Sequence, residues 1–155
     1  MATNIVYNAK LRNTSICGAT ETILMHEKIV KKFCNPILKK LEDNNCKIYG
    51  DNFIKKNYSG TLYPAKEKDW STEYLTAAVS VKVVKNLKQA IAHINRYGTM
   101  HTDSIITKNK KTATLSETIK GGLGKAKRMS LGKFKAGGKN PEGQSQIKGK
   151  TFTYG

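Results

Sequence analysis

Short β-branched apolar runs alternate with amphipathic helical patterns in the first two thirds of the chain. The run VSVKVV at 79–84 is typical of a strand, and NLKQAIAHINRYG after it has the apolar spacing of a helix that ends at Gly98. A further short apolar run, SIIT, follows at 104–107. Strand, helix and strand joined by short links predict a βαβ unit and therefore an α/β domain.

The same alternation begins nearer the start of the chain. IVYNAKL has moderate helical character, TILMH at 22–26 is typical of a strand, and residues 27–42 place apolar side chains at helical spacing opposite lysines. Pro36 falls inside this helical pattern, so we expect a kink or a restart of the helix there. KIYGD predicts another short strand, and residues 56–72 have the composition of a loop.

Glycine and lysine dominate the last third of the chain. Nine of the 13 glycines fall in residues 121–155, and residues 108–155 hold twelve basic and two acidic residues, more than half of the net charge of +17. Each glycine costs a helix or strand about 0.5–1 kcal/mol relative to alanine, so such a segment has little with which to offset the entropy of ordering. We expect 108–155 to be a weakly ordered basic tail, with one short helix from Thr114, where TLSE matches a capping box.

Cysteine usage and hydropathy indicate the compartment. Cys17, Cys34 and Cys46 are an odd number without paired spacing, which is typical of reduced thiols, and the chain has no C-x-x-C or Cys/His cluster of a metal site. No apolar run reaches the roughly 18 residues of a membrane span, and the first residues do not resemble a secretory leader. We therefore expect a soluble, cytoplasmic protein with no metal and no membrane partner.

Residues 84–105, VKNLKQAIAHINRYGTMHTDSI, carry the most specific pattern in the chain. This stretch resembles the characteristic motif of glutamate-5-semialdehyde dehydrogenases, also called gamma-glutamyl phosphate reductases, in the aldehyde dehydrogenase superfamily. The twelve matching positions are Val84, Ala90, Ile91, His93, Ile94, Tyr97, Gly98, Thr99, His101, Thr102, Asp103 and Ile105. IVYNAKLRNTSICGATETIL, and KDWSTEYL followed by VSVKVV, resemble the same family. The resemblance covers about residues 4–107 and implies two parts, a partial reductase catalytic domain at 1–107 and a basic tail at 108–155 without a family counterpart.

The resemblance implies an incomplete aldehyde-dehydrogenase-type catalytic domain and a reductase of proline biosynthesis. Such an enzyme uses NADPH to reduce gamma-glutamyl phosphate to glutamate 5-semialdehyde, with release of phosphate. Cys17 matches the position of the family's nucleophile, whose thiolate attacks the acyl phosphate and forms a thioester that accepts hydride. A free thiol has a pKa of about 8.5, so Cys17 would need a helix terminus or a cation such as Arg12 or Lys10 beside it. Without the resemblance, a lone cysteine is more often a small packed side chain.

The same resemblance gives further candidate residues, each with a plainer alternative. Glu73 in STEYL corresponds to a superfamily stretch whose glutamate contacts the nicotinamide ribose; a solvated side chain is the alternative. His101, Thr102 and Asp103 in GTMHTD are candidates for a substrate loop, or they hold that loop through side-chain hydrogen bonds. His93 lies on an apolar helical stretch, which favours a structural role over a catalytic one.

The resemblance also implies more than these residues supply. The family places a cofactor-binding domain before most of this region and further strands after Thr107, so we expect a truncated remnant that is inactive by itself. One alternative is a split reductase, in which a separate chain supplies the cofactor domain; a homo-oligomer is a further possible assembly. Another alternative is nucleic-acid binding through the basic tail. AT-rich coding would produce the same lysine, asparagine and isoleucine richness without any such binding.

Overall fold

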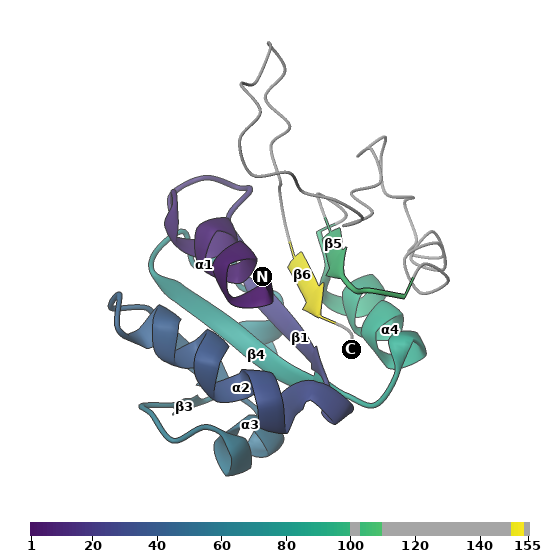
Figure 1. The fold of residues 1–155 in the computed structure, drawn as a ribbon. Coiled ribbons are helices and arrows are strands. Elements are labelled where there is room, and N and C mark those ends of the chain that lie inside the picture. The colour runs from purple at the N-terminus through teal and green to yellow at the C-terminus, as the bar shows by residue number, and fades with distance from the viewer. Residues whose placement is uncertain (100–102, 110–149, 154–155) are drawn as a thin grey trace, which may run out of the picture.

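A parallel six-stranded sheet forms the centre of the fold (Figure 1). The computed structural model describes residues 1–99, 103–109 and 150–153. The strands, in their order across the sheet, are β3 (Tyr63–Pro64), β2 (Lys47–Gly50), β4 (Ala78–Val84), β1 (Thr22–His26), β6 (Lys150–Thr153) and β5 (Asp103–Ile106). Every neighbouring pair is parallel. The α/β class predicted from the sequence is confirmed.

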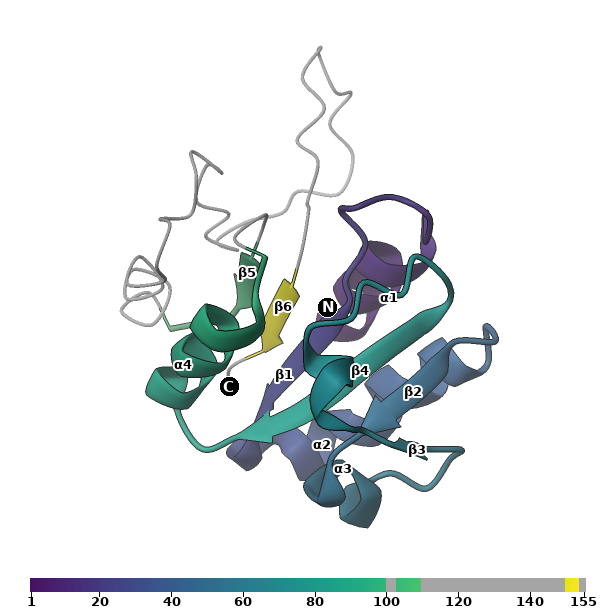
Figure 2. The ribbon, with the colours of Figure 1, turned by 180° about the vertical axis from the view of Figure 1, so that it is seen from behind.

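Helices cover both faces of this sheet (Figures 1 and 2). The helices are α1 (Ala2–Leu11), α2 (Glu27–Glu42), α3 (Asn52–Asn57) and α4 (Leu87–Tyr97), with one 3-10 helix, η1 (Glu67–Trp70). The first three lie together on one face, where they bury the larger hydrophobic core. α4 and η1 lie on the other face, where α4 buries a smaller apolar cluster.

Strand β1 is buried along its whole length because both of its faces are covered. Ile23 and Met25 belong to the larger core under α1 and α2, whereas Leu24 packs with Ala90 and Ile94 of α4. A strand that is covered on both sides gains from an apolar residue at every position. Ile23, Leu24 and Met25 in TILMH therefore form a continuous apolar run and lack the alternation of a half-exposed strand.

Helix α2 runs unbroken through Pro36, so the helix does not restart at that position. A proline inside a helix removes one backbone hydrogen bond and costs about 3 kcal/mol. Ile37, Leu38 and Leu41 follow it, and each is at most 1% exposed. Burying one side chain of this size contributes about 1.5–3 kcal/mol, so the apolar face of α2 outweighs the proline.

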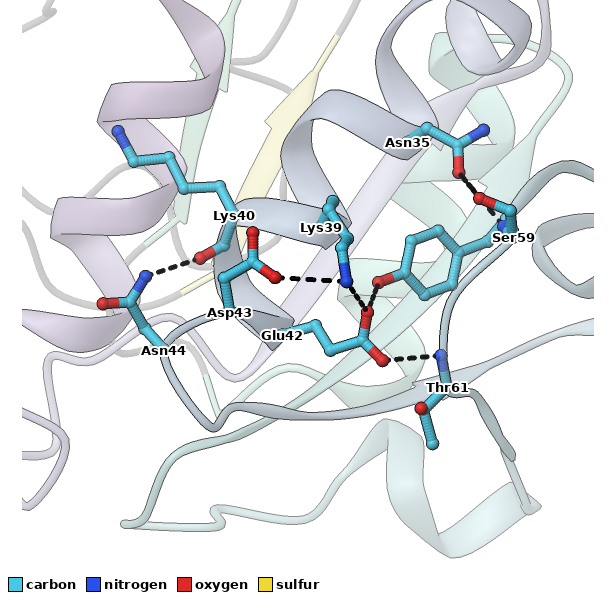
Figure 3. Close-up of polar contacts among 9 residues, drawn as sticks. Asn35, Lys39, Lys40, Glu42, Asp43, Asn44, Ser59 and Thr61 are labelled. Carbon is cyan, nitrogen blue, oxygen red and sulfur yellow. Dashed lines mark hydrogen bonds and ion pairs between the residues drawn. The ribbon is translucent and has the colours of Figure 1, made fainter.

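The C-terminal end of α2 is tied to the chain that follows α3 (Figure 3). Glu42 accepts hydrogen bonds from the Thr61 amide at 2.6 Å and from the Tyr58 hydroxyl at 2.7 Å. Lys39 donates to the same carboxylate at 3.1 Å. Residues 56–72, expected to be a loop, begin with the last two residues of α3 and also contain β3 and η1, and the rest is irregular. The bonds to Glu42 hold their first part against α2.

Strand β6 comes from the segment that we expected to be a weakly ordered tail. Residues Lys150–Thr153 pair with β1 on one side and with β5 on the other. KTFT contains β-branched and aromatic residues, which favour a strand once two neighbours supply backbone partners. The helix expected from Thr114 lies outside the described residues. No helix within the described part of the chain combines the length and apolarity needed to cross a bilayer.

Candidate functional site

The candidate residues lie on chain segments that lead into parallel strands. Cys17 precedes β1, Glu73 precedes β4, and Asp103 is the first residue of β5. Because these strands are parallel, all three positions lie at one edge of the sheet, which we call the amino edge. The segment between α1 and β1 arches beyond this edge in Figure 1. His101 and Thr102 lie outside the described residues.

Cys17 sits in an exposed turn between α1 and β1. α1 ends at Leu11 and α2 begins at Glu27, so this segment does not place a helix terminus at the thiol. Gly18 and Ala19, directly after the cysteine, are both buried. Cys17 is therefore a solvent-facing thiol on a packed support, and the alternative of a small side chain packed in the core does not hold.

The segment that carries Cys17 is closed at its base by a buried ion pair. Lys10, at the end of α1, has a fully buried side chain whose Nζ lies 2.8 Å from Glu21 Oε2. The Thr20 amide donates to the carbonyl of Ala9 at 2.9 Å, beside this pair. Residues 12–20, called the Cys17 segment below, therefore leave the body of the protein and return to it at one place.

Glu21 also contacts the chain that carries Glu73. Its Oε1 accepts a long hydrogen bond of 3.4 Å from the Leu75 amide. Its backbone carbonyl accepts from the Ser80 amide at 2.9 Å, where β1 and β4 begin to pair. Glu73 itself is exposed, and it lies two residues from Leu75 in residues 71–77, called the Glu73 segment below. One carboxylate thus joins the end of α1, at the base of the Cys17 segment, to the Glu73 segment.

Leu75 has an unusual backbone conformation for a residue with a side chain. Its φ is 51°, in the left-handed region, and the residue is 43% exposed. A non-glycine residue in this region costs on the order of 1–2 kcal/mol. Before this residue, Tyr74 shares a 2.9 Å hydrogen bond with the hydroxyl of Ser80 on β4. After it, the Ala77 carbonyl accepts from the Lys47 amide at 2.8 Å, so the segment is held on both sides of the strained residue.

The other two cysteines are in a different environment from Cys17. Cys34 is fully buried in the core and Cys46 is 4% exposed. Burial raises the pKa of each thiol to about 11, with a smaller contribution from Asp51 at Cys34. Both thiols stay protonated near neutral pH. Cys17 is therefore the cysteine that a reagent or substrate in solution reaches first.

His93 belongs to an aromatic cluster on the face of the sheet covered by α4. Its ring packs edge-on against Trp70, with centroids 5.5 Å apart, and against Tyr97 at 4.6 Å. His93 is 6% exposed. These contacts fix η1 to α4, which supports the structural role that its position on an apolar helix favours.

The opposite edge of the sheet, where the strands end, is called the carboxyl edge below. Open parallel sheets bind the pyrophosphate of a dinucleotide at this edge, at a helix N-terminus that follows a strand. In the described part of the chain, α2, α3 and α4 each follow a strand and each begin with a capping side chain. The His26 ring, the Asp51 carboxylate and the Asn86 amide oxygen accept first-turn amides of α2, α3 and α4. Burial lowers the pKa of His26, which favours the neutral ring that can accept this bond. Glu27 adds a negative charge to the first turn of α2.

These termini do not fit a dinucleotide. The first-turn amides of Lys28, Ile54 and Gln89 already have partners, and the carboxylates of Glu27 at α2 and Asp51 at α3 would repel a pyrophosphate. Within residues 1–99, 103–109 and 150–153, no group of three or more His, Cys, Asp or Glu side chains is arranged to hold a metal ion. What the described residues offer is an exposed thiol, Cys17, and its anchored support.

Comparison with known proteins identifies relatives of this region. No protein-family model matches the chain. The gamma-glutamyl phosphate reductase of Parvibaculum lavamentivorans is 45% identical over 113 residues, which are 73% of this chain and 26% of that protein. That of Bartonella quintana is 46% identical over 119 residues, 74% of this chain and 27% of that protein. The chain is related to gamma-glutamyl phosphate reductases.

A solved structure gives the same relationship for the fold. The crystal structure of gamma-glutamyl phosphate reductase from Thermotoga maritima matches with a TM-score of 0.71 and 38% sequence identity. The match covers 74% of this chain and 27% of that one. The resemblance to the reductase family noted from the sequence is confirmed, and the chain spans about a quarter of the length of the reductases that it matches.

The ion pair between Lys10 and Glu21 is the part of the site that sequence reasoning missed. Lys10 is a candidate cation for the thiol by its position in the sequence, but its ammonium is held by Glu21. A lysine near the end of a helix and a glutamate before a strand are usually solvated, and their pairing depends on how α1 packs beside β1. A weak signal is present all the same, since Glu21 directly precedes the short apolar run TILMH, which is typical of a buried strand.

Proposed function

We propose that the chain carries out acyl capture at Cys17, the first chemical step of gamma-glutamyl phosphate reduction. The observation that carries this proposal is the exposure of Cys17 on an anchored segment, while Cys34 and Cys46 are buried. The homology to gamma-glutamyl phosphate reductases supports the substrate, since their name states an acyl phosphate.

The proposed step is a substitution at the acyl carbon. The Cys17 sulfur attacks the carbonyl carbon of gamma-glutamyl phosphate, a C–S bond forms, and the C–O bond to the phosphate breaks. The electron pair of that bond leaves with inorganic phosphate, which takes up the proton that the thiol has lost to solvent. The product is a thioester on Cys17, with no change in oxidation state.

Reduction of the thioester needs a hydride donor, which acyl capture at Cys17 does not. The family resemblance implies that NADPH supplies the hydride and that Glu73 is near its ribose. The N-termini of α2, α3 and α4 at the carboxyl edge do not fit the pyrophosphate of a dinucleotide. We therefore assign no hydride-transfer step to these residues. We propose that the 155 residues do not turn over by themselves, and that turnover needs a cofactor site from outside these residues, for example on a separate chain.

Mass spectrometry of the full chain tests this proposal. Incubation with freshly prepared gamma-glutamyl phosphate is expected to place a hydroxylamine-sensitive glutamyl group on the peptide that contains Cys17, and C17S is expected to remain unmodified. NADPH added to the same mixture is expected to stay unoxidised. Sustained NADPH oxidation that C17S abolishes would overturn the inactive part of the proposal. Absence of the glutamyl adduct on the wild-type chain would overturn all of it.

Nucleic-acid binding is the second candidate function, and one observation favours it. Residues 108–155 carry more than half of the positive charge, although most of them lie outside the described residues. Filter binding of RNA at two salt concentrations tests this candidate. A variant with about six lysines of 108–155 changed to glutamine is expected to bind more weakly and with a smaller salt dependence if the tail makes phosphate contacts. Unchanged binding would exclude residues 108–155 as the RNA-binding part of the chain.

A further inference from the structure

The buried pair of Lys10 and Glu21 joins three parts of the molecule. Lys10 belongs to α1, Glu21 directly precedes β1, and the Leu75 amide that donates to Glu21 belongs to the Glu73 segment. Lys10 is fully buried and Glu21 is 7% exposed, so water screens these contacts little. Any movement of the base of the Cys17 segment, at Lys10 and Glu21, relative to the Glu73 segment has to break a contact to this carboxylate.

Stability is a poor explanation for this arrangement. Removing two charges from water is costly, and apolar residues of similar volume in place of a buried ion pair often leave stability unchanged or higher. What an apolar pair cannot do is direct hydrogen bonds. Glu21 uses one carboxylate oxygen for the Lys10 ammonium and the other for the Leu75 amide, so its place fixes the end of α1, where the Cys17 segment begins, and the Glu73 segment at once.

We propose that Lys10 and Glu21 are positioning residues that hold the Cys17 segment against the Glu73 segment, so that an acyl group on Cys17 is presented toward residues 71–77. Neither residue acts on the substrate. The proposal rests on the proposed function for the identity of the acyl group, but the coupling of the two segments is testable without it.

The first test measures amide hydrogen exchange by mass spectrometry in a variant that keeps the volume and loses the bonds. K10M/E21L replaces the ion pair by two apolar side chains, so we expect a folded protein with unchanged exchange in β1, β4 and α2. Exchange in both the Cys17 segment and the Glu73 segment is expected to rise by tenfold or more. E21D, which keeps the charge but is one methylene shorter, is expected to have a smaller effect in the same two segments.

The matched control is D43N, which removes an exposed ion pair of similar length from the end of α2. Lys39 Nζ lies 3.1 Å from Asp43 Oδ1, and this pair is distant in sequence from both segments. Exchange in residues 12–20 and 71–77 is expected to be unchanged in D43N. If both segments loosen in the control as well, their exchange does not report on the buried pair, and the proposal fails.

Three results in K10M/E21L would overturn the proposal. In the first, neither segment changes; in the second, one segment changes without the other; in the third, β1, β4 and α2 exchange faster to the same degree, which indicates a general loss of stability. If K10M/E21L does not fold, E21D decides by the same criteria, because it keeps a carboxylate beside Lys10.

A second readout separates positioning from thiol exposure. Alkylation of Cys17 by iodoacetamide needs no orientation, so its rate is expected to stay within about twofold of wild type in K10M/E21L. Transfer of the glutamyl group from gamma-glutamyl phosphate to Cys17 is expected to fall tenfold or more. Equal losses in both reactions would overturn the positioning role. If the wild-type chain takes up no glutamyl group, the proposed function fails, while the exchange experiment still decides whether the pair couples the two segments.

Discussion

The Tyr58 hydroxyl donates a 2.7 Å hydrogen bond to Glu42 and thereby joins the chain after α3 to the last turn of α2. The Thr61 amide donates to the other oxygen of the same carboxylate at 2.6 Å. Glu42 thus fixes this stretch at both of these points, and Figure 3 shows Thr61 and Lys39 converging on it. Loss of the carboxylate should release residues 58–61 without disturbing the sheet.

Replacing Glu42 by alanine is expected to lower the melting temperature by a few degrees. The substitution leaves the hydroxyl of Tyr58, a residue that is 7% exposed, and the amide of the exposed Thr61 without their acceptor, and water can reach the Thr61 amide. Thermal unfolding followed by circular dichroism measures the change. S59A, in the same stretch, does not remove a bond to Glu42 and is expected to have the smaller effect; an equal effect would contradict the role assigned to Glu42.

Acid is expected to destabilise the wild-type chain through the same carboxyl group. Hydrogen bonds from Thr61 and Tyr58, with a further one from Lys39, lower the pKa of Glu42 to about 2. A carboxyl whose folded pKa is lowered contributes stability above its unfolded pKa of about 4.5 and loses it as the pH falls toward 2. Urea unfolding between about pH 5 and 2 is expected to show a shallower pH dependence for E42Q than for wild type. Identical slopes would exclude Glu42 as a source of the acid sensitivity.

The three cysteines are expected to differ in their reaction with iodoacetamide. Cys17 is exposed, whereas Cys34 and Cys46 are buried and burial raises their pKa values to about 11. At about pH 8 we expect alkylation of Cys17 at least a hundredfold faster than that of the other two, because a buried thiol reacts after the protein opens. Peptide mass spectrometry over time measures the three rates. Comparable rates under native conditions would contradict the burial of Cys34 and Cys46.

Much of the fold follows from local sequence pattern. TILMH becomes β1 at Thr22–His26 and the helical spacing at 27–42 becomes α2 with the same bounds, because each has an uninterrupted apolar face. The pattern does not predict α3, since its six residues bury little besides Ile54 and its start depends on the Asp51 cap. It does not predict β6 either, because glycine-rich composition masks a four-residue strand whose partners, β1 and β5, are distant in sequence.

The candidate site is predictable to a smaller degree. The family resemblance singles out Cys17 from the order of the residues alone, and the parallel sheet places Cys17, Glu73 and Asp103 at the same edge. The ion pair of Lys10 and Glu21 is not predictable, because burial of a lysine is decided by how α1 packs beside β1 and not by its own neighbours in sequence. The order of the residues thus identifies Cys17 as a candidate, whereas the ion pair that anchors its segment depends on tertiary packing.

Gly60 is a position where even a methyl group is expected to be harmful. A Cβ atom there would lie 2.6 Å from Tyr58 Cζ, and it would also meet the Glu42 carboxylate. G60A is therefore expected to push Tyr58 away from Glu42 and to lower the free energy of unfolding by about 1–3 kcal/mol. Urea denaturation measures the change. In the E42A background the same substitution is expected to cost less, because the hydrogen bond that it disturbs is already gone; full additivity would argue against this mechanism.

Breaking the buried ion pair on one side is expected to be the most damaging of these changes. K10M leaves the Glu21 carboxylate buried without its cation, and removal of one partner of a buried pair typically costs about 3–5 kcal/mol. K10M/E21L removes the second charge as well, so its free energy of unfolding is expected to return close to that of wild type. Urea denaturation of K10M, E21L and K10M/E21L beside wild type completes a double-mutant cycle. If K10M is no less stable than the double variant, water reaches Glu21 in the folded protein and the pair is not the enclosed contact that its burial indicates.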